Sequence, residues 1–243
     1  MTIDNTLVVV PARGGSKRIP NKNIKTICGQ PMIYWPLKEL SKSFRSDRIL
    51  VSTDDEDIVR TVQAKGLQVP FIRPDELSDD HTGTMDVVTH ALDWYENNVA
   101  PVDYVLVVYP TAVLLETTDI EEAYAKLVAD EKCDAVFSAT SFPFPIQRAV
   151  FEGEKQYVEM FQPQNFAVRS QDLTEAFHDA GQFYFCRSNT VRQSLNFGNS
   201  QWKLQKLRRN KVVDIDTLED FELAESKMRL LGFEDSDKSW SFD

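Results

Sequence analysis

The chain has 243 residues, enough for one large domain with a small appendage, and its 27 Lys and Arg against 38 Asp and Glu give a net charge of −11. An acidic chain of this kind argues against nucleic acid or an anionic membrane as a general partner. Because no run of about 18 apolar residues is present, no membrane span is expected, and no signal peptide either. The three cysteines lack C-x-x-C spacing, which favours free thiols in a reducing cytoplasm over a disulfide or zinc site.

Strand and helix patterns alternate from residue 7 to residue 140. Short β-branched or wholly apolar runs predict strands at 7–10, 48–53, 69–73, 104–109 and 135–140. Helical signals lie between them at 31–44, where Pro31 is expected in the first turn, and at 54–65, 84–97 and 118–130. One face of the third helix is apolar, with Val87, Val88, Ala91, Leu92 and Tyr95 at helical spacing. This alternation predicts an α/β fold whose parallel sheet is covered by helices on both faces.

The regular alternation stops near residue 141. Residues 142–179 hold three prolines and several aromatic residues, which predicts a protruding hairpin arm that acts as a lid or a dimer contact. Strands are predicted again at 182–186, 204–207 and 211–215, followed by a final helix at 217–231. The tail after that helix is expected to fray, although Trp240 and Phe242 could dock on the body.

A basic loop follows the first strand. Four cations, Arg13, Lys17, Arg18 and Lys22, surround a Gly-Gly pair without any acid in the stretch. Glycines let backbone N–H groups approach phosphate oxygens, and Lys and Arg neutralise their charge. Since α/β folds bind ligands at the carboxyl ends of strands, the loop predicts a phosphate site, with a solvated basic loop as the alternative. The order of the glycines fits neither a P-loop nor a dinucleotide fingerprint.

Two acids, Asp214 and Asp216, stand two residues apart near the C-terminus. In a strand their side chains would point to the same side, so both carboxylates could hold one Mg²⁺, which usually takes one or two carboxylates plus substrate phosphates. The alternative is structural: Asp216 could cap the last helix, with Glu219 completing a capping box.

Residues 13–23, Arg-Gly-Gly-Ser-Lys-x-x-Pro-x-Lys-Asn, resemble the signature loop of the CMP-N-acetylneuraminic acid synthetase family, in which this loop wraps the triphosphate of CTP. The Asp-Ile-Asp at 214–216 resembles the metal-binding acids of that family. The resemblance implies a three-layer α/β/α nucleotide-diphospho-sugar transferase fold with a mostly parallel sheet and residues 142–179 as an inserted dimerisation arm. It also implies Mg²⁺-dependent transfer of CMP from CTP to a nine-carbon keto sugar acid by a homodimer.

Carried over position by position, the resemblance assigns roles to individual residues. The nucleotide would contact Ala12, Arg13, Gly14, Gly15, Lys17, Lys22, Asn23, Arg73 and Thr84. Arg13 and Lys17 would act in catalysis with the metal ligands Asp214 and Asp216. The alternative for Arg73 is a surface arginine at a strand end. The sugar acid would contact Tyr109, Thr111, Gln147, Arg148, Arg169, His178, Gln182 and Tyr184. Tyr109 stands where the family more often has Gln.

Three strings in the middle of the chain resemble the family members that act on pseudaminic acid, at 144–148, 169–172 and 178–182. That sugar carries acetamido groups where sialic acid has hydroxyls, together with a C9 methyl, so amide partners and an apolar wall are expected. Legionaminic and N-acetylneuraminic acid remain alternative substrates. Other nucleotidyltransferases, for an eight-carbon keto acid or an alditol phosphate, and a nucleotide-binding regulator without turnover are the remaining alternatives.

Overall fold

The computed structural model describes residues 3, 5–193, 197–233 and 240–242. Its centre is a six-stranded sheet in the order β10-β6-β9-β5-β1-β4. These strands are β1 (Thr6–Pro11), β4 (Ile49–Ser52), β5 (Tyr104–Val108), β6 (Ala135–Ser141), β9 (Phe177–Arg187) and β10 (Trp202–Lys206). The helices are α1 (Tyr34–Leu40), α2 (Glu56–Gln63), α3 (Thr84–Asn98), α4 (Thr117–Val128), α5 (Ser188–Val191) and α6 (Leu218–Leu230). Two small hairpins complete the fold, β2 (Thr26–Ile27) with β3 (Gln30–Pro31), and β7 (Val150–Glu152) with β8 (Val158–Met160).

The sheet is parallel except at one strand. β1 pairs in parallel with β4 and β5, and β10 pairs in parallel with β6, whereas β9 runs antiparallel to both of its neighbours. The mostly parallel α/β architecture is therefore confirmed. Because β1, β4 and β5 share a direction, the loops at their carboxyl ends meet at one edge of the sheet.

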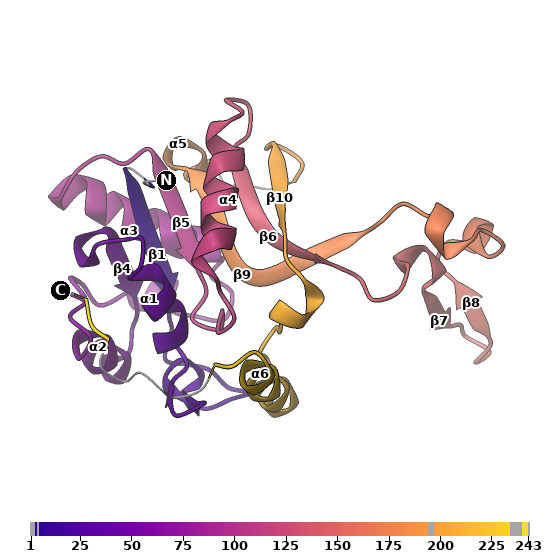
Figure 1. Ribbon diagram of the computed structural model, residues 1–243, viewed down its shortest axis with the longest axis horizontal. Coiled ribbons are helices and arrows are strands. Elements are labelled where there is room, and N and C mark those ends of the chain that lie inside the picture. The colour runs from indigo at the N-terminus through magenta and orange to yellow at the C-terminus, as the bar shows by residue number, and fades with distance from the viewer. Residues whose placement is uncertain (1–2, 4, 194–196, 234–239, 243) are drawn as a thin grey trace.

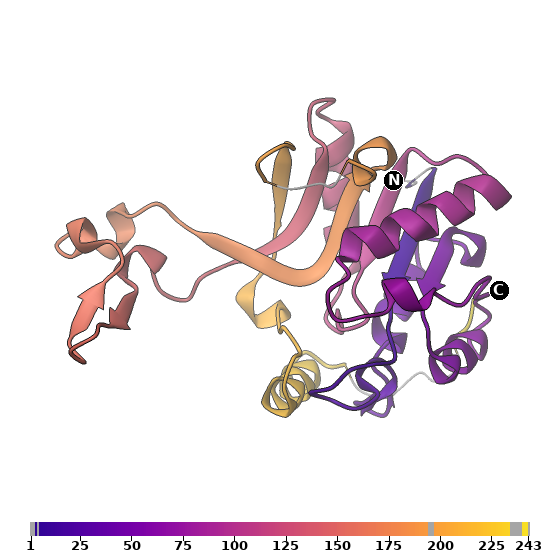
Figure 2. The same cartoon turned by 180° about the vertical axis from the view of Figure 1, so that it is seen from behind.

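Helices cover both faces of the sheet, which makes three layers (Figures 1 and 2). The alternation of β1 shows how: Val8 and Val10 pack with residues of α1, α2 and α4, while Leu7 and Val9 pack with α3 and α5. The predicted apolar face of 84–97 is the buried face of α3. A third apolar cluster joins α6 to the segment that follows β1. Among the described residues, no helix is both long and apolar enough to cross a bilayer.

Residues 142–176 project from the body as an arm that carries β7 and β8 at its far end, whereas residues 177–179 of the predicted arm pair with β6 in the sheet (Figure 1). β9 is longer than its predicted core of 182–186, because it begins at Phe177, inside this segment. The strand thus leads directly from the arm into the middle of the sheet.

Three predicted elements differ in the structure. Residues 69–73 form no ladder, since Pro70 lacks an N–H donor and Arg73 makes a single backbone bond, to the Thr53 carbonyl. Residues 211–215 also lie outside the sheet, because side chains satisfy their carbonyls instead. Pro31 belongs to β3, and α1 begins only at Tyr34.

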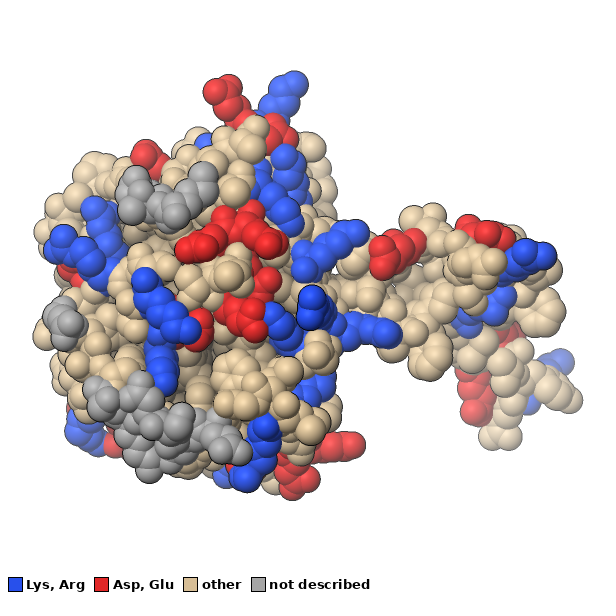
Figure 3. Space-filling model, in the orientation of Figure 1, with Lys and Arg blue, Asp and Glu red and all other residues tan. Residues whose placement is uncertain are grey.

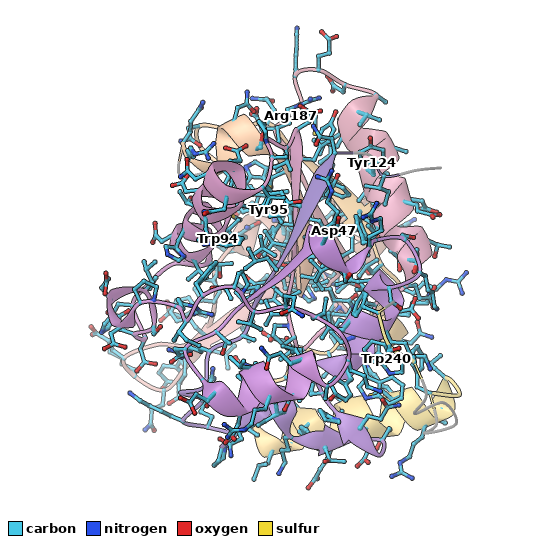
Figure 4. All side chains as sticks on the ribbon, turned by 90° about the vertical axis from the view of Figure 1, so that its left-hand side faces the viewer. Asp47, Trp94, Tyr95, Tyr124, Arg187 and Trp240 are labelled. Carbon is cyan, nitrogen blue, oxygen red and sulfur yellow. The ribbon has the colours of Figure 1, made fainter. Side chains whose placement is uncertain are left out.

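The C-terminal residues 240–242 dock on the body. Trp240 donates from Nε1 to Gln30 and meets the Tyr34 ring edge to face, with centroids 5.5 Å apart (Figure 4). Phe242 is buried, and its N–H donates to the carbonyl of Lys65. Helix α2 ends just before this contact, and Gly66 after it has a φ of +85°, a conformation that favours glycine.

Candidate active site

A pocket of about 510 Å³ opens at the carboxyl ends of β1 and β5. Its lining comes from the basic loop, from the segment 73–84 and from the residues after β5. The lining residues are Pro11, Arg13, Ser16, Lys17, Arg18, Lys22, Asn23, Arg73, Leu77, Asp79, Asp80, Thr82, Thr84, Val87, Tyr109, Pro110 and Thr111. Many of the residues predicted to bind a nucleotide therefore surround one cavity.

The basic loop is fixed at both ends. Buried Ala12 donates its N–H to the Ser52 carbonyl at 2.9 Å, and Asn23 Nδ2 donates to the Arg13 carbonyl at 2.8 Å. Gly14 donates to Asp54 Oδ1 at 2.9 Å, and a Cβ there would come within 2.3 Å of the Asp55 carboxylate, so this position requires glycine. Gly15, in contrast, faces open space that a phosphate could fill.

Two cations of the loop form ion pairs with a carboxylate of the same chain. Arg13 donates to Asp80 Oδ1 at 2.7 Å and to the Asp79 carbonyl, and Lys17 lies 2.5 Å from Asp80 Oδ2. Hydrogen bonds from Lys17 and Arg13 lower the pKa of Asp80. Cations that converge on one anion in a pocket favour an anion site over a solvated basic loop.

The acid pair lies beside the pocket. Lys22, a lining residue, donates from Nζ to the Ile215 carbonyl at 2.7 Å and lies 3.4 Å from Asp216 Oδ1, which Arg18 approaches at 2.9 Å. Burial, and then the charge of Asp216, raise the pKa of Asp214. The two acids thus form a concentration of negative charge that a cation would relieve.

The structural alternative, in which Asp216 caps the last helix and Glu219 completes a capping box, is wrong. Thr217 is the N-cap of α6, and its capping box is completed by Asp220, which accepts from the N–H groups of both Thr217 and Asp216. Asp216 is therefore not needed to cap the N-terminus of α6.

Hydrogen bonds from side chains, rather than a β-ladder, hold residues 211–215, the segment before α6. Gln182 Nε2 donates to the Lys211 carbonyl at 2.6 Å, Lys227 Nζ to the Val212 carbonyl at 2.8 Å, and Ile215 is fully buried. Gln182, predicted to contact the sugar, is only 3% exposed, and its side-chain amide donates to the Lys211 carbonyl of this segment. Its placement supports the acid pair rather than an open sugar pocket.

Arg73 and Thr84 line the side of the pocket formed by the segment 73–84. Arg73 is 4% exposed, and its guanidinium donates to the hydroxyl and carbonyl of Ser52, while burial lowers its pKa. The alternative of a surface arginine is therefore wrong. Thr84 is the first residue of α3, and its hydroxyl lies 3.0 Å from that of Tyr109.

Tyr109 and Tyr184 meet edge to face, with ring centroids 5.9 Å apart. Tyr184 donates to the carboxylate of Asp179, which also accepts from the N–H of Gly181 at 2.7 Å. Burial raises the pKa of both tyrosines, so each keeps its proton. Thr111, two residues after Tyr109, also lines the pocket.

The remaining predicted sugar contacts lie on or near the arm. Gln147 donates to the Thr174 carbonyl, Arg148 donates to the Val168 carbonyl, and Arg169 is exposed at the start of a short helical turn. His178 packs on Phe142, with ring centroids 4.8 Å apart. None of the four lines this pocket in the described residues, so their contact with substrate stays a prediction.

Three acids of this region escaped the sequence argument. Asp54 and Asp80 reach the loop from segments far away in the sequence, and Asp179 accepts from Tyr184 on the same strand, β9. Asp80 and Asp179 adjoin predicted positions, but a lone acid in a polar loop carries no pattern of its own.

The comparisons with known proteins agree with this geometry. Residues 7–233 match the cytidylyltransferase family. A pseudaminic acid cytidylyltransferase of Campylobacter jejuni is 38% identical over 90% of this chain and 94% of that protein. A CMP-N,N'-diacetyllegionaminic acid synthase of Legionella pneumophila is 26% identical over 92% and 96%. A CMP:2-keto-3-deoxy-manno-octonic acid synthetase solved with CTP has the same fold, with a TM-score of 0.69 at 17% identity over 94% of this chain and 100% of that one. The chain therefore belongs to the cytidylyltransferase family and is a nucleotidyltransferase.

Proposed function

We propose that this enzyme transfers CMP from CTP to pseudaminic acid and releases pyrophosphate, with Mg²⁺ as its cofactor. The observation that carries the proposal is the position of Lys22, which lines the cationic pocket and also contacts the Asp216 carboxylate and the Ile215 carbonyl. One side chain thus joins the predicted triphosphate site to the predicted metal ligands.

In the proposed reaction, the anomeric hydroxyl oxygen of the sugar attacks the α-phosphorus in line. The bond from that phosphorus to the bridging oxygen breaks, pyrophosphate leaves with the electron pair, and the hydroxyl proton is released. Such chemistry depends on positioning and charge neutralisation rather than on a protein nucleophile. Arg13 and Lys17 would bind the departing phosphates once their bonds to Asp80 have opened.

The acid pair fits Mg²⁺ in its chemistry. Asp214 and Asp216 would hold the ion through carboxylate oxygens, and the bound ion would neutralise charge on the phosphates. Within the described ranges no group of three or more His, Cys, Asp or Glu side chains is arranged for a metal, so substrate and water oxygens would complete the shell. Burial, together with the charge of Asp216, raises the pKa of Asp214, so a bound cation would stabilise the ionised form of this carboxyl.

The choice of pseudaminic acid is supported by relatives of comparable coverage. The Campylobacter jejuni enzyme named for that sugar is 38% identical, against 26% for the Legionella pneumophila enzyme named for a legionaminic acid. Residues 144–148, 169–172 and 178–182, which resemble the pseudaminic acid enzymes, lie in the arm and at the start of β9.

The arm is proposed to make a homodimer. Phe144, Tyr157 and Phe166 are 80%, 72% and 77% exposed in the single chain, and an isolated two-stranded hairpin is marginal in water. A second copy would cover this surface and would bring Arg169 to the neighbour's pocket, where its charge suits the sugar carboxylate.

Steady-state kinetics with a panel of sugar acids tests the assignment. We expect kcat/KM for pseudaminic acid to exceed that for N-acetylneuraminic acid by about 10⁴, since a site built for particular polar groups rejects analogues that lack them. Legionaminic acid, a stereoisomer with the same groups, is the sharper control. Comparable values for pseudaminic and N-acetylneuraminic acid would refute the choice of sugar.

A further inference from the structure

Arg18 is the cation of the basic loop to which the family resemblance assigns no role. It lines the pocket together with Arg13 and Lys17, while its guanidinium forms an ion pair with Asp216 Oδ1 at 2.9 Å. Its side chain therefore reaches two places where a positive charge is needed, the proposed triphosphate site and a proposed metal ligand. A long side chain in such a position can serve both places in turn.

A metal ion and Arg18 would compete for Asp216. Lys22 lies 3.4 Å from the same carboxylate oxygen, so two cations converge on it, whereas Asp214 has no ion-pair partner among the described residues. Mg²⁺ held by the two acids would place a double positive charge beside the guanidinium, and like charges at short range repel. Metal binding therefore favours the departure of one cation from Asp216.

Arg18 is the cation that can leave at the lower cost. Lys22 is anchored, because its Nζ also donates to the carbonyl of buried Ile215 at 2.7 Å and its side chain is only 19% exposed. The Arg18 side chain is 65% exposed, and Asp216 is its one ion-pair partner within the ranges that the structure describes. An exposed ion pair of this kind contributes a factor of about five or less to an equilibrium, so a metal can displace the guanidinium.

The pocket gives the displaced guanidinium a new partner when a nucleotide is bound. A triphosphate carries more negative charge than Arg13 and Lys17 together neutralise, and the guanidinium fork matches the oxygens of a phosphate. Because Arg18 lines this cavity, a change of side-chain rotamer is enough to bring it to a ligand there.

We propose that Arg18 neutralises Asp216 in the free enzyme and passes to the phosphates of the nucleotide when Mg²⁺ takes its place, so that the metal and CTP bind cooperatively. The inference rests on the proposed function, which places the metal on Asp214 and Asp216 and the triphosphate on the basic loop. Without the metal, CTP must draw Arg18 away from Asp216; with the metal, that pair is already broken. By linkage, bound CTP must favour metal binding by the same factor.

Binding of Mn²⁺ and of CTP to Arg18→Gln tests the exchange without turnover, since no sugar acid is present. Mn²⁺ alone, followed by its EPR signal, should bind about two- to fivefold more tightly than to the wild type, because a competing cation is gone. This gain should disappear once CTP is bound. Calorimetric CTP affinity should fall about tenfold with Mg²⁺, the value of a charge-assisted hydrogen bond, and this loss should be about two- to fivefold smaller in EDTA.

The matched control is Lys25→Gln. Lys25 belongs to the same segment, but its Nζ lies over the Phe221 ring, 5.5 Å from the centroid, and it does not line the pocket. The variant loses one positive charge without touching Asp216 or a ligand, so its Mn²⁺ and CTP affinities should equal those of the wild type. Arg18→Lys keeps a charge that can exchange and should restore part of the cooperativity.

The outcomes separate the two proposals. Mn²⁺ affinity that is unchanged by Asp216→Asn, or a wild-type protein that binds no CTP, would contradict the proposed function. Normal metal and CTP binding in the wild type, with equal losses of CTP affinity in Arg18→Gln with Mg²⁺ and in EDTA, would overturn the exchange and leave the function standing. Weaker Mn²⁺ binding to Arg18→Gln would also overturn it, since Arg18 would then support the metal instead of competing with it.

Discussion

The body and the arm of this enzyme use similar residues in opposite ways. In the body, Phe183 and Phe185 are fully buried between the sheet and its helices. In the arm, Phe144, Phe161 and Phe166 are 80%, 67% and 77% exposed, and the β7–β8 hairpin has almost no buried face (Figure 1). In a single chain, therefore, the aromatic residues of the body are buried in its core, whereas those of the arm stay exposed to solvent.

The same division runs through the site. The pocket, the basic loop and the acid pair belong to the body, while Gln147, Arg148 and Arg169 belong to the arm. Acidic and basic side chains are interspersed over the face of the body drawn in Figure 3, so the gathering of cations at the loop is a local feature. We infer that the body binds the nucleotide and that the arm of a second copy contributes to recognition of the sugar.

The largest effect should come from the acid pair. Asp216→Asn should lower turnover by several decades, because one of two metal carboxylates is lost. Since Thr217 and not Asp216 caps α6, stability should change by only about 0.5 kcal/mol, as for an ordinary surface substitution.

The matched control for that variant is Thr217→Ala, which should cost about 1 kcal/mol of stability and keep most of the activity. Thermal unfolding and kinetics of the two variants check both statements. An Asp216→Asn enzyme with a near-normal rate would contradict the catalytic role of the pair.

The division between body and arm is tested by mixing inactive variants. Arg169→Ala mixed with Asp216→Asn should regain roughly a quarter of wild-type activity, because half of the dimers are mixed and each has one intact site. The control is Lys17→Ala mixed with Asp216→Asn: both changes lie in the body, so no mixed dimer has an intact site. If the subunits exchange and the first mixture stays inactive, Arg169 does not act across the interface.

Lys17→Ala should have a smaller effect, and it should lower the rate of the reaction more than the affinity for CTP. Charge moves toward the leaving pyrophosphate as the bond breaks, so the rate should fall by about two decades while CTP affinity falls much less. Steady-state kinetics beside calorimetry measures the two losses. Equal losses would mean that the lysine serves ground-state binding alone.

The smallest effect should come from Asp80, which holds Arg13 and Lys17 in the absence of nucleotide. Asp80→Asn removes a competing carboxylate and should tighten CTP binding by about two- to fivefold, since exposed ion pairs are worth 0–1 kcal/mol. The gain should shrink at high salt. Calorimetric titration checks it, and weaker binding would show that Asp80 organises the loop rather than competing for it.

Much of the body could be predicted from local patterns. The apolar run 7–10 and the one-sided apolar face of 84–97 each specify an element whose period is visible in the sequence. Residues 69–73 and 211–215 also look like strands, but a ladder needs a neighbour with free donors and acceptors, and this depends on tertiary structure.

The candidate site shows the same limit. The basic loop and the pair of Asp214 and Asp216 can be recognised as motifs. Asp54 and Asp80, which the fold brings to the loop, are single acids without a pattern of their own. The N-cap of α6 is Thr217, one residue after the alternative position Asp216, so Asp216 has no capping role.

Product analysis by ³¹P NMR after incubation with CTP, Mg²⁺ and pseudaminic acid tests the proposed reaction most directly. We expect one pyrophosphate for each CMP-pseudaminic acid formed, and no product when the sugar acid is left out. Formation of CDP, or release of CMP and pyrophosphate without a sugar nucleotide, would contradict it.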